Sequence, residues 1–234
     1  MNMYILAIIP ARSGSKGIKN KNIKIYNDKP LLVHSIDIAI ESKYISEVIV
    51  STNSSEYKKI AESHGALVPY LRPEEISLDL STDFEYLKYH IDWCISNGKK
   101  IPDLIVQLRP TYPNRNIKIL NETINIMINN YDKYDSLRTV VKFEKSPFKM
   151  YRIKDDNLIP LFKKIDDIDE PYNQCRQILP DTYLHNGYID IIKSDIINKY
   201  NSVTGHKIYP YIMNAEETND IDTLEDWNKS LINK

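Results

Sequence analysis

A glycine-containing, cationic loop at residues 10–22 constrains the fold of this chain more than any other feature. It follows an apolar run at residues 4–9, which predicts a buried strand. Gly14 and Gly17 leave the backbone free to bend and to approach a ligand, and one Arg and three Lys lie in the same loop. This combination suits a polyphosphate, whose oxygens accept many hydrogen bonds. The alternative is an ordinary turn between a strand and a helix, with solvated lysines.

Strand-like and helix-like segments alternate along the rest of the chain. Strands are predicted at residues 47–52, 66–71, 103–108, 137–141, 182–191 and 208–213. Helices are predicted between them, with Ser54 or Ser55, Ser81 or Thr82, Ser194 and Asp222 as N-caps. Such an alternation is typical of an α/β fold in which helices connect the strands of a mostly parallel, doubly wound sheet.

The stretch from residue 147 to residue 180 breaks this alternation. It is rich in charged residues and has few long apolar runs. We therefore expect a single domain over residues 1–234 with an inserted segment at about 142–180, either a flap or an arm that reaches a second subunit.

The composition excludes several classes of function. The 31 Lys and Arg residues are balanced by 32 Asp and Glu residues, so nucleic acid is not an expected partner. Cys94 and Cys175 lie far apart, which argues against a zinc site or a disulfide framework. The sequence has no apolar run long enough to span a bilayer and no signal-like start. We expect a cytoplasmic protein without a membrane partner.

Charged residues gather just after the predicted strands, where ligands of a doubly wound sheet bind. The cations that could surround one polyanion are Arg12, Lys16, Lys19, Lys21, Arg72, Arg109 and Arg115. Asp220 and Asp222 alternate across Ile221 and would lie on one side of an extended segment. Two carboxylates beside a polyphosphate predict a Mg²⁺ site. For Asp222 a plain helix N-cap is the alternative.

The loop does not match the common phosphate-binding fingerprints. The spacing of GxxxxGK[ST] is absent, and GxGxxG lacks its third glycine. A P-loop ATPase and a dinucleotide oxidoreductase are therefore disfavoured. The histidines show no metal-ligand spacing, and no Gly-x-Ser-x-Gly elbow indicates a hydrolase nucleophile.

The loop, with Lys21 and Asn22 at its end, resembles the signature of the CMP-sialic acid synthetases, the acylneuraminate cytidylyltransferases. Six further motifs of that family follow in the expected order, and so the resemblance covers nearly the whole chain. They lie at residues 50–52, 71–74, 109–115, 176–180, 186–187 and 220–223.

The resemblance implies a Rossmann-like nucleotidyltransferase and a homodimer formed through the inserted arm. It also implies Mg²⁺-dependent transfer of CMP from CTP to the anomeric hydroxyl of a 2-keto sugar acid, with release of pyrophosphate. The implied nucleotide-binding residues are Ala11, Arg12, Ser13, Gly14, Ser15, Lys16, Lys21, Asn22, Arg72, Thr82 and Asp83. The implied sugar-binding residues are Arg109, Thr111, Lys149, Arg176, His185, Asn186 and Gly187. Asp220 and Asp222 would hold Mg²⁺, and Arg12, Lys21 and Asp220 would be catalytic.

The chain departs from the family pattern mainly at the implied sugar site. Arg109 stands where the family usually has Gln, and Leu184-His185 where it often has Arg-Pro. Val203-Thr204 stands where sialic acid enzymes have an aromatic pair. The expected acceptor is therefore a nonulosonic acid, with legionaminic- and pseudaminic-type sugars included. The alternatives are a 3-deoxy-manno-octulosonate cytidylyltransferase, another sugar nucleotidyltransferase, a non-catalytic nucleotide-binding homologue, and a structural α/β protein.

Overall fold

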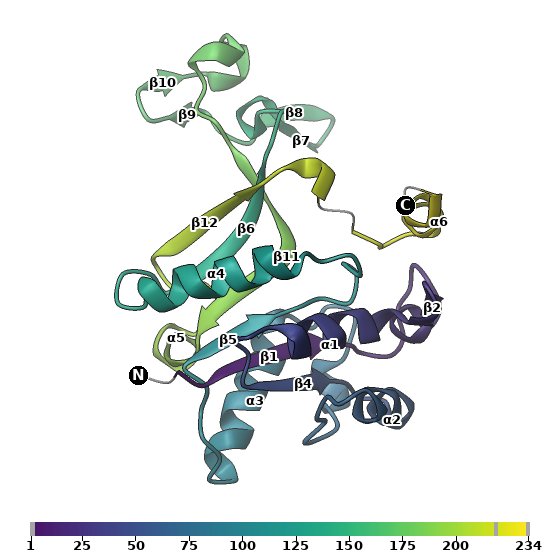
Figure 1. Ribbon diagram of the computed structural model, residues 1–234. Coiled ribbons are helices and arrows are strands. Elements are labelled where there is room, and N and C mark those ends of the chain that lie inside the picture. Colours follow the sequence, from purple (N-terminus) through teal and green to yellow (C-terminus); the bar gives the residue numbers. More distant parts are fainter. Residues whose placement is uncertain (1–2, 218–219, 233–234) are drawn as a thin grey trace.

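The computed structural model describes residues 3–217 and 220–232, and the remaining positions of the expected 1–234 domain lie outside the described residues. Its centre is a six-stranded sheet in the order β12–β6–β11–β5–β1–β4 (Figure 1). The strands are β1 (Ile5–Pro10), β4 (Glu47–Ser51), β5 (Leu104–Gln107), β6 (Ser136–Lys142), β11 (Tyr183–Lys193) and β12 (Ile208–Met213).

The predicted mostly parallel sheet is confirmed. β1 runs parallel to both β4 and β5, and β12 runs parallel to β6. β11 is the exception, because it pairs antiparallel with β5 on one side and with β6 on the other. The carboxyl ends of β1, β4 and β5 therefore lie at one edge of the sheet, where the cationic stretches begin.

Helices cover both faces of this sheet. They are α1 (Leu31–Glu41), α2 (Ser55–Ser63), α3 (Asp83–Ser96), α4 (Ile117–Asn129) and α5 (Ser194–Tyr200). A sixth helix, α6 (Leu224–Ile232), lies off the sheet (Figure 1), where its Trp227 packs with Tyr26 and Leu31. Side chains of β1 alternate between two cores: Ile5 packs with α1, α2 and α4, whereas Leu6 packs with α3 and α5. None of the helices within the described residues is long and apolar enough to cross a membrane.

Three local predictions are wrong. Ser194 is the first residue of α5 rather than its N-cap; Lys193 stands at the cap position, and no side chain makes a capping hydrogen bond there. Residues 66–71 form no strand; Leu67 makes a single bridge to Ile49, and the chain cannot continue the pairing through Pro69, which has no N–H. Asp222 does not cap α6, since the Thr223 hydroxyl accepts from the backbone N–H of Asp226 and the Asp226 carboxylate accepts from Thr223 in return. The Asp222 side chain is thus left for another contact.

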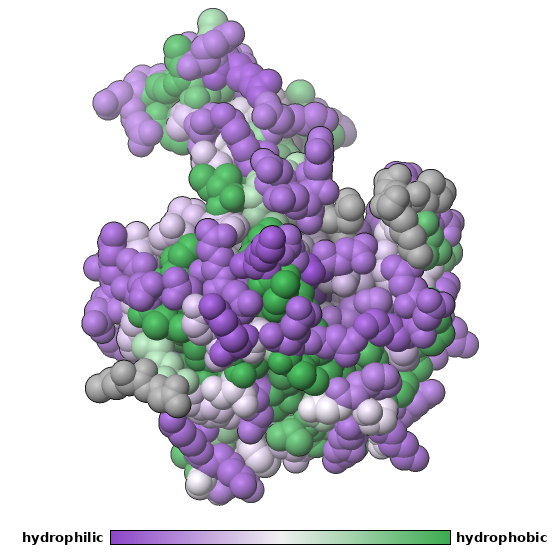
Figure 2. Space-filling view, in the orientation of Figure 1, coloured by the Kyte–Doolittle hydropathy of each residue, from purple (hydrophilic) through white to green (hydrophobic). Residues whose placement is uncertain are grey.

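Residues 143–182, which we call the arm, leave the sheet after β6 and return into β11, where Tyr183 pairs with Lys142. The arm projects away from the sheet (Figures 1 and 2). It holds two hairpins, β7 (Tyr151–Lys154) with β8 (Asn157–Pro160) and β9 (Lys164–Ile165) with β10 (Ile168–Asp169). Its exposed apolar side chains include Met150, Ile153, Leu158, Leu161 and Phe162. That the arm dimerises stays a prediction.

Short elements complete the chain. β2 (Ile25–Tyr26) and β3 (Lys29–Pro30) form a small hairpin before α1. Single 3₁₀ turns lie at Lys21–Ile23, Glu74–Ile76, Pro147–Lys149, Pro171–Asn173, Arg176–Ile178 and Ala215–Glu217.

Arg115 is a structural tie rather than a phosphate ligand, which corrects its expected place among the cations. Its guanidinium is buried and donates to the carbonyl oxygens of Tyr188 (2.8 Å), Tyr112 (2.9 Å) and Arg109 (2.5 Å). It also donates to the Ser35 hydroxyl at 2.9 Å. One side chain thereby joins α1, β11 and the loop after β5.

We expect Arg115→Met to lower the free energy of unfolding by about 2–4 kcal/mol, because buried carbonyl groups would lose charged donors. Urea denaturation followed by circular dichroism measures this. Arg152→Met on the exposed arm strand β7 is the control and should change stability by less than about 0.5 kcal/mol. Equal stability of the two variants would contradict the structural role of Arg115.

Candidate active site

The loop of residues 11–22 crosses the carboxyl edge of the sheet and is anchored at both ends. Ala11 is buried, and its N–H donates to the Ser51 carbonyl at the end of β4 (2.9 Å). Near the other end, the buried Asn22 amide donates to the Arg12 carbonyl (3.1 Å). Between them the N–H of Ser13 donates to Asn53 Oδ1 (2.9 Å). These bonds fix the loop while its cationic side chains stay near the surface.

Lys21 connects this loop to the acidic segment at residues 220–222. Its Nζ donates to the Ile221 carbonyl (3.1 Å) and pairs with Asp222 Oδ1 (2.7 Å). The Ile221 N–H in turn donates to the Thr111 carbonyl (3.0 Å), so the acidic segment is docked on the loop after β5 as well. A side chain on Gly17 would meet the Asp222 carbonyl oxygen at 2.5 Å, which explains why glycine is needed here.

Asp220 and Asp222 are the two carboxylates predicted to hold Mg²⁺. Desolvation raises the pKa of the Asp220 carboxyl, a hydrogen bond to Thr111 opposes this, and the nearby Asp222 carboxylate raises it further. Among the described residues no group of three or more His, Cys, Asp or Glu could enclose a metal. Two carboxylates suffice for Mg²⁺, which binds proteins through one or two carboxylates and takes its other ligands from phosphate and water.

A cavity of about 340 Å³ opens between the loop, the acidic segment and α3. It brings together ten of the predicted site residues: Arg12, Ser15, Lys16, Lys21, Asn22, Arg72, Asp83, Arg109, Thr111 and Asp222. Gly17, Ser81 and Tyr86 also line it, although none of them was predicted as a site residue. Ala11, Ser13, Gly14 and Thr82 adjoin lining residues in sequence without lining the cavity themselves, and Asp220 lies two positions before the lining residue Asp222.

Asp79 is a functional candidate that sequence reasoning missed. Its carboxylate pairs with Arg12 Nη2 (2.9 Å) and with Lys16 Nζ (2.5 Å). The hydrogen bond from Lys16, helped by Arg12, lowers the pKa of Asp79. A carboxylate of the chain therefore occupies two cations that the loop would offer to a phosphate group. Nothing in the sequence around Asp79 signals this, because the residue lies in an irregular segment before α3.

Arg72 is a fixed cation in the cavity wall. Its Nε donates to the Ser51 hydroxyl (3.0 Å), its Nη2 donates to the Ser51 carbonyl (2.6 Å), and the guanidinium stacks over the Tyr86 ring at 4.7 Å. Burial lowers the pKa of Arg72. Since two of its nitrogens are committed to β4, Arg72 presents its charge in one orientation.

Arg109 lies just after β5 and lines the cavity, and two carboxylates hold its guanidinium. Its Nη2 pairs with Asp83 (2.5 Å) and its Nη1 with Asp190 (2.7 Å). Burial lowers the pKa of Arg109, but the charges of Asp190 and Asp83 outweigh this and raise it overall. Asp190, which sequence reasoning missed, could have been noticed as a charged residue inside the apolar strand run 188–192.

His185, Asn186 and Gly187 do not line the cavity. They form the irregular stretch of β11 where its pairing with β6 shifts register. His185 Nε2 contacts Asp190 Oδ1 (2.7 Å), and the Gly187 carbonyl accepts from Arg109 (3.2 Å). Asn186 accepts from the Thr139 hydroxyl (2.6 Å). In one chain these residues support Arg109, and their contact with a sugar stays a prediction.

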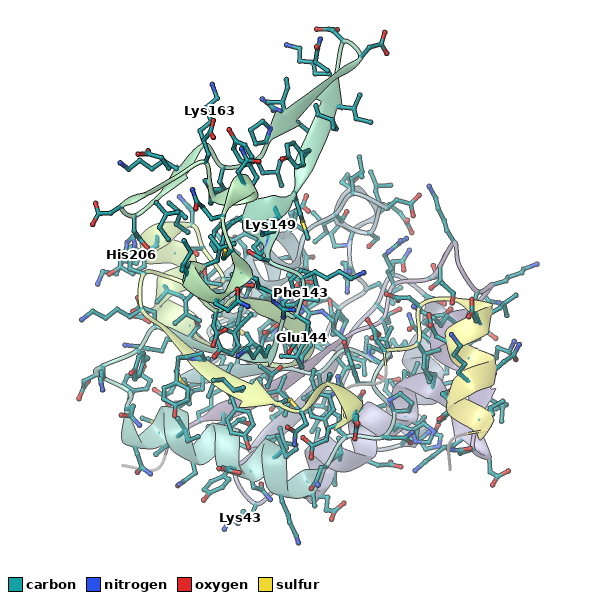
Figure 3. All side chains as sticks on the ribbon, turned by 90° about the horizontal axis from the view of Figure 1, so that it is seen from above. Lys43, Phe143, Glu144, Lys149, Lys163 and His206 are labelled. Atoms are coloured by element: carbon teal, nitrogen blue, oxygen red, sulfur yellow. The ribbon has the colours of Figure 1, made fainter. Side chains whose placement is uncertain are left out.

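Lys149 and Arg176 lie on the arm, apart from this cavity. Lys149 donates to the Gln174 carbonyl (2.5 Å), and Arg176 pairs with Glu144 (2.5 Å). Both line a different cavity of about 390 Å³. Figure 3 shows Lys149 beside Phe143 and Glu144 where the arm begins, with Lys163 further out. Their predicted role at a sugar site therefore requires a second copy of the chain.

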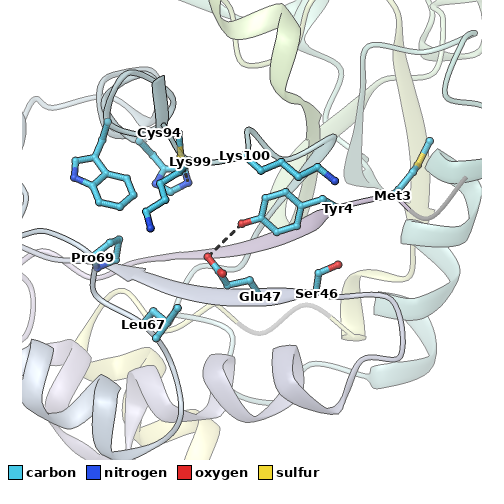
Figure 4. Close-up of a pocket in the computed structure, with 11 residues that line it drawn as sticks. Met3, Tyr4, Ser46, Glu47, Leu67, Pro69, Cys94, Lys99 and Lys100 are labelled. Carbon is cyan, nitrogen blue, oxygen red and sulfur yellow. Dashed lines mark hydrogen bonds between the residues drawn. The ribbon is translucent and has the colours of Figure 1, made fainter. Parts of the chain in front are cut away.

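A larger cavity, of about 570 Å³, lies at the opposite edge of the sheet, where β1, β4 and β5 begin (Figure 4). Its walls include Trp93, Leu67 and Pro69. The one carboxylate in its lining, Glu47, accepts from the Tyr4 hydroxyl (3.2 Å). This cavity lacks the paired carboxylates and the cationic loop of the candidate active site.

Comparisons with known proteins identify the family. Residues 6–155 match the family model described as "Cytidylyltransferase". The chain is 33% identical to an N-acylneuraminate cytidylyltransferase of Escherichia coli over 97% of its own length. It is 29% identical to the CMP-N,N'-diacetyllegionaminic acid synthase of Legionella pneumophila over 96% of its own length. The chain therefore belongs to the cytidylyltransferase family.

The relatives differ in length. The chain spans about half of the E. coli protein (51%) but 94% of the Legionella protein. It also spans 93% of a pseudaminic acid cytidylyltransferase of Campylobacter jejuni, to which it is 28% identical.

Solved structures show the same fold. A CMP:2-keto-3-deoxy-manno-octonic acid synthetase in complex with CTP superposes with a TM-score of 0.70 at 15% identity, covering 98% of both chains. A 4-diphosphocytidyl-2C-methyl-D-erythritol synthase from Anaerococcus prevotii superposes with a TM-score of 0.62 at 18% identity and covers all of both chains. At these identities the likeness establishes the Rossmann-like nucleotidyltransferase fold alone.

We expect Gly17→Ala to weaken turnover of CTP by roughly 10- to 100-fold, because a shift of about 1 Å between loop and acidic segment misplaces the reacting groups. Steady-state kinetics of pyrophosphate release measures the loss. Gly98→Ala, at the end of α3, is the control for lost stability: its φ of +59° makes an alanine strained although nothing lies near the new Cβ, so this variant should lose stability without losing activity. Full activity of Gly17→Ala would show that the close approach of residue 17 to the Asp222 carbonyl is not required for catalysis.

Asp79→Asn should tighten CTP binding, by no more than about fivefold, because exposed ion pairs contribute little. The reason is that the triphosphate no longer competes with Asp79 for Arg12 and Lys16. Isothermal calorimetry with CTP measures the affinity. Glu75→Gln, an equal charge change in the same segment, should leave it unaltered. Weaker binding by Asp79→Asn would contradict competition.

Proposed function

We propose that this chain transfers CMP from CTP to the anomeric hydroxyl of a nonulosonic acid and releases pyrophosphate. The observation that carries the proposal is the contact of Lys21 with Ile221 and Asp222, which places an acidic pair directly beside a cationic loop. A triphosphate with its metal ion needs both charges within one cavity. The family match and the names of the relatives support the same reaction.

The residues of the cavity have separate tasks in this reaction. When a sugar hydroxyl attacks the α-phosphorus, negative charge develops on the phosphate oxygens and on the leaving pyrophosphate. Arg12, Lys16 and Lys21 would stabilise that charge from the loop, and Arg72 would do so from the wall. Contacts with Ile221 and Asp222 hold Lys21, and contacts with Ser51 hold Arg72, before the substrate arrives, so these two cations need little reorganisation during the reaction.

Asp220 and Asp222 would hold Mg²⁺, which when bound supplies positive charge that neutralises the triphosphate. Lys21 restrains Asp222, and Thr111 restrains the backbone between the two carboxylates. Asp220 is the carboxyl group we assign to the side of the attacking hydroxyl.

For the acceptor we propose a sialic-acid-like nonulosonic acid, since the relatives above act on acylneuraminate, legionaminate and pseudaminate by their names. A 3-deoxy-manno-octulosonate acceptor is the second candidate, because it too is a 2-keto sugar acid. Because CTP is an intracellular nucleotide, we place the reaction in the cytoplasm.

Lys21→Ala should lower kcat roughly 100-fold or more, because a cation beside the reacting phosphate is lost. A pyrophosphate assay with CTP, Mg²⁺ and a panel of nonulosonic and octulosonic acids measures this, and the same panel identifies the acceptor. Lys19→Ala, an exposed lysine of the same loop outside the cavity lining, is the matched control. Absence of pyrophosphate release by the wild type with every acid would refute the proposed function, and CTP binding without turnover would favour a non-catalytic homologue.

We also propose that two chains pair through their arms, so that Lys149 and Arg176 complete the partner's sugar site. In that case a mixture of Lys21→Ala and Arg176→Ala should regain about a quarter of the wild-type activity after random subunit exchange, because each mixed dimer has one intact site. Mixing Lys21→Ala with Arg12→Ala is the control, since both changes affect the same site and no activity should return. No recovery in the first mixture, with both variants dimeric by light scattering, would contradict shared sites.

A further inference from the structure

Asp190 is a buried charge at the end of the candidate site where the chain departs from the family pattern. Its side chain is 3% exposed, and its two oxygens contact Arg109 Nη1 (2.7 Å) and His185 Nε2 (2.7 Å). Arg138 Nε lies 3.9 Å away. Burial alone would raise the pKa of Asp190, but the hydrogen bond from His185 and the charge of Arg109 lower it. Asp190 is therefore a permanent anion behind Arg109.

Arg109 is clamped from two sides and still has donors to offer. A guanidinium has five N–H groups. Both N–H groups of Nη1 are used, by Gly187 and Asp190, and one of Nη2 is used by Asp83. Within the described residues, the Nε–H and the second Nη2–H have no acceptor. Because Arg109 lines the cavity, a molecule bound there can reach its guanidinium.

The charge on Arg109 is already compensated by two carboxylates. A third carboxylate on the remaining donors would lie beside Asp83, which also lines the cavity, and would be repelled by it. A neutral carbonyl oxygen accepts the same hydrogen bonds without that repulsion. The site therefore favours a neutral acceptor group at Arg109, which keeps the buried Asp190 as a partner, whereas the cations paired with the exposed Asp79 and Asp222 suit the anionic parts of the substrates.

We propose that Arg109 recognises the carbonyl oxygen of an acylamido group on the acceptor sugar, and that Asp190 and Asp83 are positioning residues that hold Arg109 for this contact. The inference rests on the proposed function and narrows its substrate to acylamido sugar acids. Under this proposal Arg109 does not bind the carboxylate of the sugar.

Gly187 adds a geometric requirement to this arrangement. Its φ of +73° lies in the left-handed region, and an added Cβ would meet Arg109 Nη1 at 3.2 Å. The backbone of β11 thus leaves just enough room for the guanidinium between Gly187 and Asp83. A clamped arginine loses little side-chain freedom on binding, so its hydrogen bonds discriminate well between acceptors.

The test compares two acceptors in each variant at saturating CTP. One is the acylamido acid that the wild type uses best, and the other is its analogue with a hydroxyl in place of the acylamido group. The ratio of their kcat/KM values is the readout. In Arg109→Met the ratio should fall roughly 10- to 100-fold, because a charged hydrogen bond is lost, while the KM for CTP stays within about twofold.

Asp190→Asn should lower the same ratio in the wild-type background but not in the Arg109→Met background, because Asp190 acts through Arg109. Asp83→Asn is a second variant, at a partly exposed position. It leaves no buried charge unpaired, because Arg109 still pairs with Asp190. Thermal melting identifies the variants that fold. The Arg109→Met/Asp190→Asn double variant removes both charges together and so avoids an unpaired buried carboxylate.

Separate results overturn separate claims. An unchanged ratio in folded Arg109 and Asp83 variants, or a wild type that prefers the hydroxyl analogue or octulosonate, overturns recognition of the acylamido group while the cytidylyltransferase function stands. A further loss from Asp190→Asn in the Arg109→Met background overturns its positioning role. A wild type that releases no pyrophosphate with any acid overturns the proposed function itself.

Discussion

The contact of Lys21 with the acidic segment is the interaction on which the site depends. It joins positions 200 residues apart, with the lysine side chain only 11% exposed. Ile221 is buried beside Ile18 and Trp227, so apolar packing supports the ion pair from behind. Without this contact the cationic loop would remain, but the two carboxylates would have no fixed place relative to it. The geometry needed for a metal-bound triphosphate would then be lost.

Carboxylates of the chain pair with most cations of the site. The site has two parts, which differ in whether these carboxylates are exposed or buried. Asp79 and Asp222 are exposed, so a triphosphate and its metal ion can replace or share them at small cost. Asp190 is buried, and separating it from Arg109 would leave an unpaired charge in the core. The nucleotide part is therefore built to exchange its ionic partners, whereas the acceptor part is built to keep them.

The sequence predicted what depends on local pattern. The buried strand before the loop, the mostly parallel sheet and the grouping of Arg12, Lys21 and Asp222 follow from apolar runs and from the carboxyl-edge rule. The strand predicted at residues 66–71 was wrong. Although the segment is apolar, Pro69 interrupts its pairing and Leu67 is exposed. Long-range partners had no local signal. Asp79 pairs with residues more than sixty positions away, and Arg115 is buried only because β11 returns antiparallel beside it.

A crystal structure of the protein with CTP and Mg²⁺ tests the central claim most directly. The account predicts the triphosphate between the 11–22 loop and Asp220–Asp222, with Arg12 and Lys16 on phosphate oxygens in place of Asp79 and with Arg109 still bound to Asp190. A triphosphate bound elsewhere, for example in the large cavity beside Trp93, or a metal ion held without either aspartate, would contradict it.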